Sequence, residues 1–455
     1  MTPAGFTRRD AAGLGGLVAL AWALRAAGIA AQPLTSDDLS VAQTARAFTT
    51  QGLPEPTMWN HPRLRDLLVD VSLDWLGDGA WGIKFWSVLL GALAVPALFL
   101  LLRRLAPGKP LVAWLGAALL AFDPFQVHFA RQGIQDAYLT FFPVAGLVAA
   151  LRYRASRASG WLLLSGLLFG LGLASKWNAA FTLAVALALV AGDSWRDAVP
   201  PARRLAPLAF ALAALVVLPL TVYLLTWWPF FGRGYSFPEW LDFQRAMAVE
   251  TATHVGYPGT KLPDYYGELV GAWRWFLAPT WFVDLGLPTV GTGTTGMTWL
   301  VGVGNPLTWL LVLPALVQAA WRGWRHRDEA GALLAALFLV NYLPFLSPSR
   351  PIFANSAVLV LPWALALVGH AAAAAWERSR ALVAGWLTLA ALAASLLWLG
   401  STGLAPGASG WLVRALVPPE AWESKRLKLA RSAATPAGGA PAAQAPPAPS
   451  PAQAK

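Results

Sequence analysis

Long runs of apolar residues, separated by short polar segments, dominate this chain of 455 residues. A straight membrane-spanning helix needs about 20 consecutive, predominantly apolar residues. Some of the runs are shorter than that, and we expect their ends to lie against protein or in water-filled cavities. The pattern predicts an all-α polytopic membrane protein with eleven spans, near residues 11–31, 82–102, 110–125, 134–151, 160–175, 177–192, 205–228, 296–320, 330–347, 352–371 and 381–401.

The composition and the placement of charge agree with a membrane protein. Charged residues make up only 13% of the chain, against about 25% in soluble proteins, which excludes a soluble enzyme. The net charge of +11 is best explained by the positive-inside rule rather than by nucleic-acid binding. With residues 1–10 in the cytoplasm, every short loop predicted to be inside is basic, through Arg103, Arg104, Lys109, Arg152, Arg154, Arg157, Arg196, Arg203, Arg204, Arg322, Arg325, Arg327, Arg378 and Arg380.

This orientation divides the chain into regions. Arg8-Arg9 and the apolar stretch after them imitate a secretory signal, but the length of the stretch and Arg25 favour a retained first helix. The absence of cysteine excludes disulfides and thiol catalysis. We expect an N-terminal membrane module, 11–228, with an outer loop at 32–81; a second outer loop, 229–295; C-terminal helices, 296–401; and an outer tail, 402–455, whose Ala/Pro-rich end is largely disordered.

The first outer loop carries candidate chemistry. Asp37-Asp38 follows the first span, and a carboxylate there could act as a general base towards a hydroxyl. Alternatively, Ser36 or Asp37 caps a helix over 39–49. His61 precedes Pro62, which suits the first turn of a helix, and could be a ligand, an acid–base group or a cap. An amphipathic helix along the membrane surface should follow, its apolar face formed by Leu64, Leu67, Leu68, Val71 and Trp75, with Arg63, Arg65, Asp66, Asp70 and Asp74 facing elsewhere.

Further charges fall at the same predicted outer level. Arg131 and Asp136 flank the start of the fourth span, Lys176 lies between two spans, and Arg350 comes after the ninth. Ionisable groups at membrane depth are costly and are usually paired or functional. Arg131 and Asp136 could form an ion pair, or Arg131 could bind a phosphate that Asp136 helps to orient. Lys176 could reach lipid headgroups or bind a phosphate. Aromatic side chains of the second outer loop could form an interfacial belt or stack on a sugar.

These segments, in this order, resemble the protein O-mannosyltransferases, membrane glycosyltransferases of the GT-C type that use polyprenyl-phosphate mannose. The resemblance covers about residues 30–370. It rests on the acidic pair after the first span, the His-Pro segment, an Arg-x4-Asp spacing, a Ser-Lys-Trp segment and a region near the penultimate helix, here Asp37-Asp38, His61-Pro62-Arg63-Leu64, Arg131 with Asp136, Ser175-Lys176-Trp177, and Tyr342-Leu343-Pro344 with Ser349-Arg350-Pro351.

The resemblance implies roles for these residues. Asp37 would be the base that activates the acceptor hydroxyl, with Asp38 in support. The donor phosphate would be held by Arg131 and Lys176, with Arg350 as a third cation, and Asp136, His61 and Trp177 would support the site. It implies an inverting transfer of mannose to Ser or Thr of exported proteins at the outer face of the plasma membrane, with a lipid-linked donor and no cofactor. We predict no dedicated metal site, although Asp37, Asp38, His61 and Asp136 could form an oxygen-rich one.

Several departures from the family pattern leave the sugar and the acceptor open. Asp38 stands in place of Glu, Arg63 in place of Pro, Arg65-Asp66 in place of Gly-Lys, and Ser356 where many members carry His. The second outer loop also lacks an inserted soluble domain. One alternative is a related enzyme that transfers another polyprenyl-phosphate-linked sugar, of the aminoarabinose or arabinose type, to a lipid or glycan. A transporter is a third possibility, but it would place charges at the midplane and show internal repeats.

Overall fold

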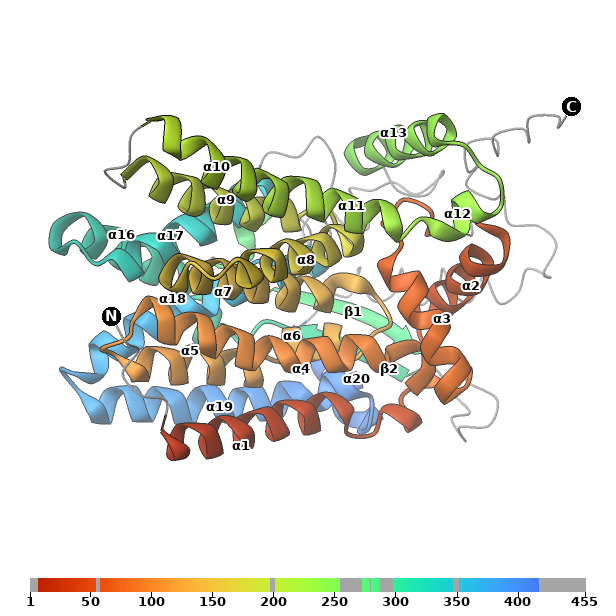
Figure 1. Ribbon diagram of the computed structural model, residues 1–455. Helices are drawn as coiled ribbons and strands as arrows, with labels where there is room; N and C mark the ends of the chain where they lie inside the picture. The colour runs from red at the N-terminus through yellow and green to blue at the C-terminus, as the bar shows by residue number, and fades with distance from the viewer. Residues whose placement is uncertain are drawn as a thin grey trace, which may run out of the picture.

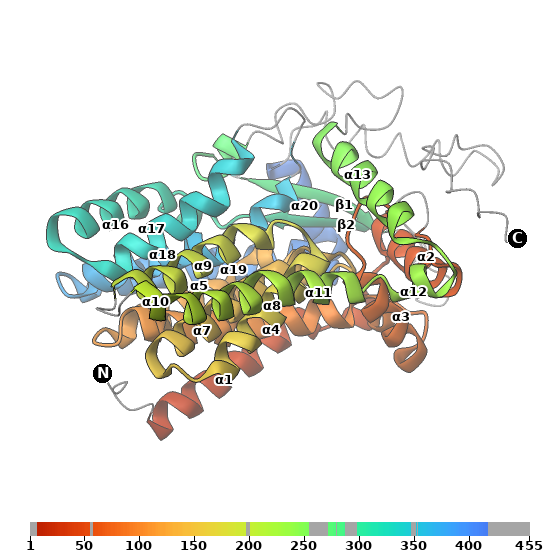
Figure 2. The same cartoon turned by 45° about the horizontal axis from the view of Figure 1, so that its top comes forward.

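The computed structural model describes residues 7–54, 58–196, 201–253, 272–278, 280–286, 298–346, 352 and 354–416. Within these ranges the chain is a bundle of helices with one small antiparallel sheet (Figure 1). The long helices of the bundle run side by side, and shorter helices gather at one end of it (Figures 1 and 2). The predicted all-α class is therefore correct for the bulk of the fold, and the sheet is the exception.

The N-terminal half of the chain supplies most of the bundle. Its helices are α1 (Arg8–Ala26), α2 (Ser36–Gln51), α3 (Leu64–Leu76), α4 (Ala80–Leu105), α5 (Pro110–Phe122), α6 (Pro124–Ala130), the 3-10 turn η2 (Gln135–Ala137), α7 (Tyr138–Ser156), α8 (Ser159–Ser175), α9 (Ala179–Arg196), α10 (Pro201–Leu212), the π-helical turn η3 (Ala213–Val217), α11 (Leu218–Leu225), α12 (Trp228–Gly232) and α13 (Phe237–Thr253).

The C-terminal half adds the sheet and further helices. Its elements are η4 (Ala272–Arg274), β1 (Trp281–Gly286), β2 (Thr298–Val303), α15 (Pro306–Trp309), α16 (Val312–His326), α17 (Glu329–Tyr342), the 3-10 turns η5 (Leu343–Phe345) and η6 (Ala354–Leu359), α18 (Leu361–Trp376), α19 (Arg380–Thr402) and α20 (Pro406–Leu416).

Four helical segments of the described residues are long and apolar enough to cross a membrane: Arg8–Ala31, Ala80–Leu105, Leu205–Leu225 and Arg380–Thr402. A fifth is obtained if α5 and α6, which meet at a 58° bend, count as one broken span. Further apolar helices are shorter, at Ser159–Ser175, Ala179–Asp193, Glu329–Phe345 and Leu361–Trp376. The predicted spans thus fall mostly on apolar helices, while the number that cross a bilayer stays a prediction.

The predicted span at 296–320 is wrong in its first part. Residues Thr298–Val303 form strand β2, which pairs with β1 in antiparallel register, Trp281 opposite Val303. The short helix α15 follows at Pro306–Trp309, and the long helix of this region, α16, begins only at Val312. The segment that begins at Thr298 contains the β-branched residues Val301 and Val303, and a short apolar run of this kind does not distinguish a strand from a buried helix.

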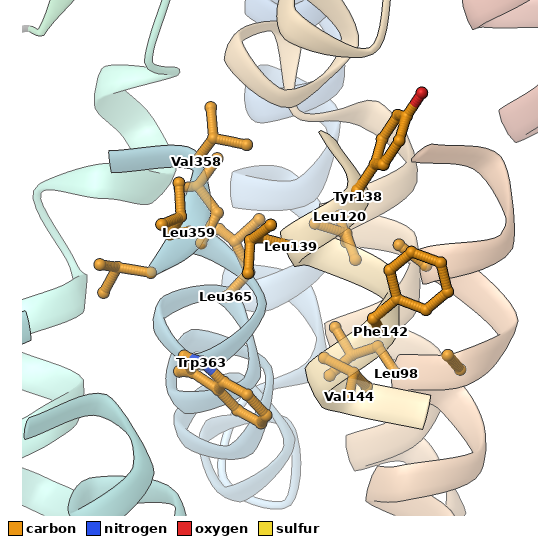
Figure 3. Close-up of a cluster of buried hydrophobic side chains, with 14 of the residues drawn as sticks. Leu98, Leu120, Tyr138, Leu139, Phe142, Val144, Val358, Leu359, Trp363 and Leu365 are labelled. Carbon is orange, nitrogen blue, oxygen red and sulfur yellow. The ribbon is translucent and has the colours of Figure 1, made fainter. Parts of the chain in front are cut away.

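The centre of the bundle is a continuous apolar core where α4, α5, α7 and α18 meet (Figure 3). Leu98, Leu120, Phe142 and Leu365 are among its buried side chains. Helices α5 and α18 approach so closely that a Cβ on Gly369 would lie 2.6 Å from the backbone nitrogen of Gly116. Glycine at this crossing is what lets the two backbones meet, as small residues do between membrane helices.

The helix that carries the acidic pair Asp37-Asp38 lies at one end of the bundle. Helices α2, α3, α12 and α13 lie there, at the right of Figure 1, whereas the turn between α16 and α17 lies at the opposite end. The start of α1 is also at the opposite end, so α1 leads the chain directly towards α2 (Figures 1 and 2). We call the end with α2 and α3 the acidic-loop end.

Candidate active site

The two acids Asp37 and Asp38 have different environments. Helix α2 begins with a capping box in which the Thr35 hydroxyl accepts a hydrogen bond from the Asp38 N–H, and Asp38 Oδ2 accepts one from the Thr35 N–H. The N-cap is therefore Thr35, not Ser36 or Asp37 as predicted. This arrangement buries Asp38 fully and leaves Asp37 partly exposed. Of the pair, only Asp37 has a side chain that a substrate can reach.

Asp38 is held by two further contacts. Lys84 of α4 places its Nζ 3.0 Å from Asp38 Oδ2, and both side chains are fully buried. Asp38 Oδ1 accepts a hydrogen bond of 2.7 Å from the N–H of Gly133. A Cβ on Gly133 would lie 3.3 Å from that oxygen and 2.6 Å from a methyl group of Ile83. The carboxylate thus joins α2, α4 and the loop after α6.

Lys176 forms an ion pair with Asp136. Its Nζ lies 2.7 Å from Asp136 Oδ1, and the lysine keeps 19% of its side chain exposed while Asp136 keeps 3%. Asn355 of η6 donates a longer hydrogen bond of 3.4 Å to Asp136 Oδ2. The sequence analysis did not single out Lys84 or Asn355. Lys176 is a cation whose ammonium group is held by a carboxylate, while its side chain stays partly exposed to a ligand.

One short loop connects these two carboxylates. Four consecutive residues, Gly133 to Asp136, each receive a contact from a different element. Gly133 binds Asp38 of α2, and the Ile134 carbonyl accepts from the Ser87 hydroxyl of α4 at 3.0 Å. Gln135 Oε1 accepts from Arg65 Nη1 of α3 at 2.8 Å, and Asp136 binds Lys176 after α8. The structure therefore brings Asp38, Asp136 and Lys176 together around what we call the hub loop, residues 131–137, and Asp37 is the chain neighbour of Asp38.

Arg131, which begins the hub loop, is placed differently from the prediction. Its Nη1 donates to the carbonyls of Arg25 and Ala27, each at 2.8 Å, so that it binds the end of α1 and not Asp136. Its Nε and Nη2 are buried without a hydrogen-bond partner among the described residues. Burial lowers the pKa of Arg131 to about 10, which still leaves the guanidinium charged at neutral pH.

The helix after His61 departs from the predicted surface helix. Arg63, Arg65 and Asp66 are fully buried, not turned towards solvent. Arg63 Nη1 and Arg65 Nη2 lie 2.7 Å and 2.6 Å from the two oxygens of Asp66. Only the far part of α3 behaves as predicted, where Asp70 and Asp74 form ion pairs with Arg46 at the surface. His61 itself is half-buried, and its carbonyl accepts a hydrogen bond from Arg63.

Trp177 links the Lys176 turn to the outer helices. Its indole N–H donates to the Tyr223 hydroxyl at 3.1 Å, which in turn donates to Gln244 of α13 at 2.6 Å. Arg350 lies outside the described residues, as do the tail beyond residue 416 and Tyr257, Tyr265 and Tyr266 of the second outer loop.

The possible oxygen-rich metal site is not assembled among the described residues. No three His, Asp or Glu side chains of these ranges come together as a metal-binding group. Asp38 and Asp136 each contact a lysine, as described above.

Residues 69–232 match the sequence model of a family described as dolichyl-phosphate-mannose-protein mannosyltransferase. This segment of the chain is similar to the protein mannosyltransferases. The chain is 25% identical over 340 residues to the polyprenol-phosphate-mannose–protein mannosyltransferase of Mycobacterium tuberculosis. That alignment covers 63% of this chain and 64% of the relative, so the match spans less than two thirds of the relative's length.

The chain is also similar to a second kind of transferase in sequence, and to a solved protein O-mannosyltransferase in fold. It is 28% identical over 302 residues to an undecaprenyl phosphate-α-4-amino-4-deoxy-L-arabinose arabinosyl transferase of Pseudomonas fluorescens, across 65% of this chain and 47% of that one. The S. cerevisiae protein O-mannosyltransferase Pmt1-Pmt2 complex, solved with its sugar donor, contains a chain with the same fold, with a TM-score of 0.64 at 13% identity over 88% of this chain and 91% of that chain. The predicted resemblance and the GT-C type of fold are confirmed.

Proposed function

We propose that this chain is a multi-pass plasma-membrane glycosyltransferase that moves mannose from polyprenyl-phosphate mannose to Ser or Thr hydroxyls of exported proteins. The observation that carries the proposal is the hub loop, which binds Asp38, the chain neighbour of the partly exposed Asp37, and, through Asp136, the partly exposed Lys176. A base and a phosphate-binding cation are the two groups that such a transfer needs.

The proposed chemistry is a single displacement. The acceptor oxygen attacks the anomeric carbon of mannose while Asp37 takes the hydroxyl proton. The bond from that carbon to the phosphate oxygen breaks, and polyprenyl phosphate leaves with the electron pair, its charge stabilised by Lys176. The anomeric configuration is inverted. Because the donor is already activated, positioning and electrostatic stabilisation supply most of the catalysis.

The partly exposed cation beside the hub loop supports an anionic donor. Lys176 keeps 19% of its side chain exposed while it pairs with Asp136. A phosphodiester-linked sugar carries one negative charge, which this ammonium would attract. Orientation with the N-terminus in the cytoplasm would put the acidic-loop end outside, in accord with the positive-inside distribution of Arg and Lys.

Radiolabelled polyprenyl-phosphate mannose, supplied to membranes that contain the protein, tests the proposal. We expect label in the exported protein fraction, removable by β-elimination as expected for a sugar on Ser or Thr. A second candidate, transfer of an aminoarabinose-type sugar to a lipid, is favoured by the similarity to the Pseudomonas fluorescens transferase. Label that enters lipid only from undecaprenyl-phosphate aminoarabinose would support that candidate and reject the first.

A further inference from the structure

Two arginines and one aspartate of the first outer loop form a buried triad. Asp66 lies between Arg63 and Arg65, and none of the three side chains is exposed. These three residues are among the positions at which the chain departs from the pattern of the family it resembles. With two guanidinium groups and one carboxylate, the triad carries one net positive charge. Buried charge of this kind is costly unless its hydrogen bonds are well satisfied.

Arg63, the first arginine of the triad, forms hydrogen bonds to the turn that contains His61. Arg63 Nη2 donates to the carbonyls of Met58 and Trp59, at 3.2 Å and 3.0 Å, and also to that of His61. The guanidinium lies over the rings of Phe48 and Trp227, 5.6 Å from each centroid. Arg63 therefore organises the backbone of the turn 58–61 and ties it to α2 and α12.

The second arginine of the triad reaches the hub loop. Arg65 uses Nε and Nη2 to bind Asp66 Oδ1, at 2.8 Å and 2.6 Å, and its remaining Nη1 binds Gln135 Oε1 at 2.8 Å. Gln135 directly precedes Asp136, which anchors Lys176. A planar guanidinium can bridge two acceptors in fixed directions, which a lysine ammonium cannot do in the same way.

We infer that the triad Arg63–Asp66–Arg65 is a positioning unit for the donor-phosphate site, acting through Gln135. It fixes the distance between the His61 turn and the Asp136–Lys176 pair, so that a lipid-linked phosphate meets both at once. The inference deepens the proposed function and rests on it for the identity of the ligand. The triad does not itself bind the ligand, because all three side chains are fully buried.

The test measures the binding of polyprenyl phosphate, without any sugar, to the full-length protein in detergent or nanodiscs. In Arg65→Met, Asp66 keeps Arg63 as its partner, so that a neutral buried pair remains. In Gln135→Leu the acceptor is lost while the triad stays intact. We expect each variant to bind polyprenyl phosphate about tenfold more weakly, since small misplacements of binding groups are costly, with hydrogen exchange of residues 131–137 raised and the melting temperature close to that of the parent.

The double variant and two controls complete the design. Arg65→Met/Gln135→Leu should bind no more weakly than either single variant, because both remove the same contact. Gln135→Glu keeps an acceptor for Arg65 and should retain most of the affinity. Arg46→Gln removes surface ion pairs between the same two helices, α2 and α3, and should leave binding unchanged.

Parent-like affinity in both single variants, or losses that multiply in the double variant, would overturn the inference, as would a parent protein that does not bind polyprenyl phosphate. Mannose transfer by the parent is measured separately. Binding that depends on Arg65 in a protein that transfers no mannose would reject the proposed function and leave the inference intact.

Discussion

Adjacent residues at the start of α2 have separate tasks in this account. The buried carboxylate of Asp38 contacts Thr35, Lys84 and Gly133, whereas Asp37 is partly exposed. The assignment of the base to Asp37 and of a supporting role to Asp38 follows from that difference in burial. A fully buried carboxylate with three partners is out of contact with an acceptor hydroxyl, so Asp38 supports the site and does not act as its base.

Asp37→Asn should therefore reduce kcat by about 10² to 10⁴-fold, the range lost with a general base, while the protein remains folded and still binds the donor. Mannose transfer and thermal unfolding of the purified variant would be measured together. Turnover near that of the parent would remove Asp37 from the role of base.

Asp38→Asn should instead destabilise the fold. The substitution leaves the buried ammonium of Lys84 without its counter-charge, which costs about 3–5 kcal/mol when one member of a buried pair is removed. The melting temperature of Asp38→Asn should fall well below that of Asp37→Asn, and Lys84→Met added to Asp38→Asn should recover part of it. Equal melting temperatures for the two single variants would contradict the division of tasks.

Lys176→Ala should raise the KM for the lipid donor by about 10- to 100-fold, the loss expected for one charge-assisted hydrogen bond. Because that variant leaves Asp136 unpaired, Asp136→Asn/Lys176→Ala serves as the charge-balanced comparison. An unchanged KM for the donor in both variants would argue against Lys176 as a phosphate ligand.

The sequence motifs selected three charged residues that the structure brings to one loop, Asp38, Asp136 and Lys176, but not the partners of these residues. Asp37, Asp136 and Lys176 could be chosen because charge is costly beside apolar spans. Lys84 and Gln135 could not, since a lysine near a helix end and a glutamine in a loop are ordinary residues until the chain folds. Arg131 was predicted either to pair with Asp136 or to bind a phosphate; the structure shows its Nη1 bound to the end of α1 and not to Asp136, and the phosphate role stays a prediction.

Among the elements, helix positions were more predictable than the direction of their faces. The apolar runs at 82–102 and 381–401 fall on α4 and α19. For α3, the spacing of apolar residues correctly predicted a helix, but it could not show that Arg65 and Asp66 turn inwards. Two buried arginines balanced by one buried aspartate look, in sequence, like a polar surface. Strand β2 could not be predicted for a similar reason: it lies within an apolar run that equally suits a buried helix.

The crossing of α5 and α18 gives a prediction about packing. Gly369→Ala places a methyl group against the backbone of Gly116, and overpacking of this kind costs about 1–3 kcal/mol. Gly385→Ala in α19 is the matched control, since a Cβ there meets nothing within 4 Å, and alanine favours a helix over glycine by about 1 kcal/mol. We expect a lower melting temperature for Gly369→Ala only. Equal melting temperatures for Gly369→Ala and Gly385→Ala would show that α5 and α18 can move apart without loss of stability.

The whole molecule places its candidate chemistry at one end and its basic short loops towards the other. Trp75 of α3 is 71% exposed near the acidic-loop end, and Trp324 of α16 is 79% exposed at the opposite end. Because the chain has no cysteine, single cysteines at these positions can be labelled without background. The family resemblance and the charge pattern could predict that the candidate site and the basic loops lie at opposite ends. The long-range contacts that build the hub loop could not be predicted, because they depend on the complete fold.

In intact cells, Trp75→Cys should react with a membrane-impermeant maleimide, while Trp324→Cys should react only after permeabilisation. This pattern follows from the proposed orientation, with the N-terminus in the cytoplasm. Labelling of Trp324→Cys alone in intact cells would invert the topology and place Asp37 on the cytoplasmic side, where exported acceptors are not found.

The most direct test of the central claim is the position of the donor phosphate in a structure determined with bound polyprenyl phosphate. The account predicts a phosphate within hydrogen-bonding distance of Lys176 Nζ, on the side of the hub loop that faces Asp37. A phosphate bound at the opposite end of the bundle, or one that makes no contact with Lys176 while Asp37 points away from it, would contradict the account.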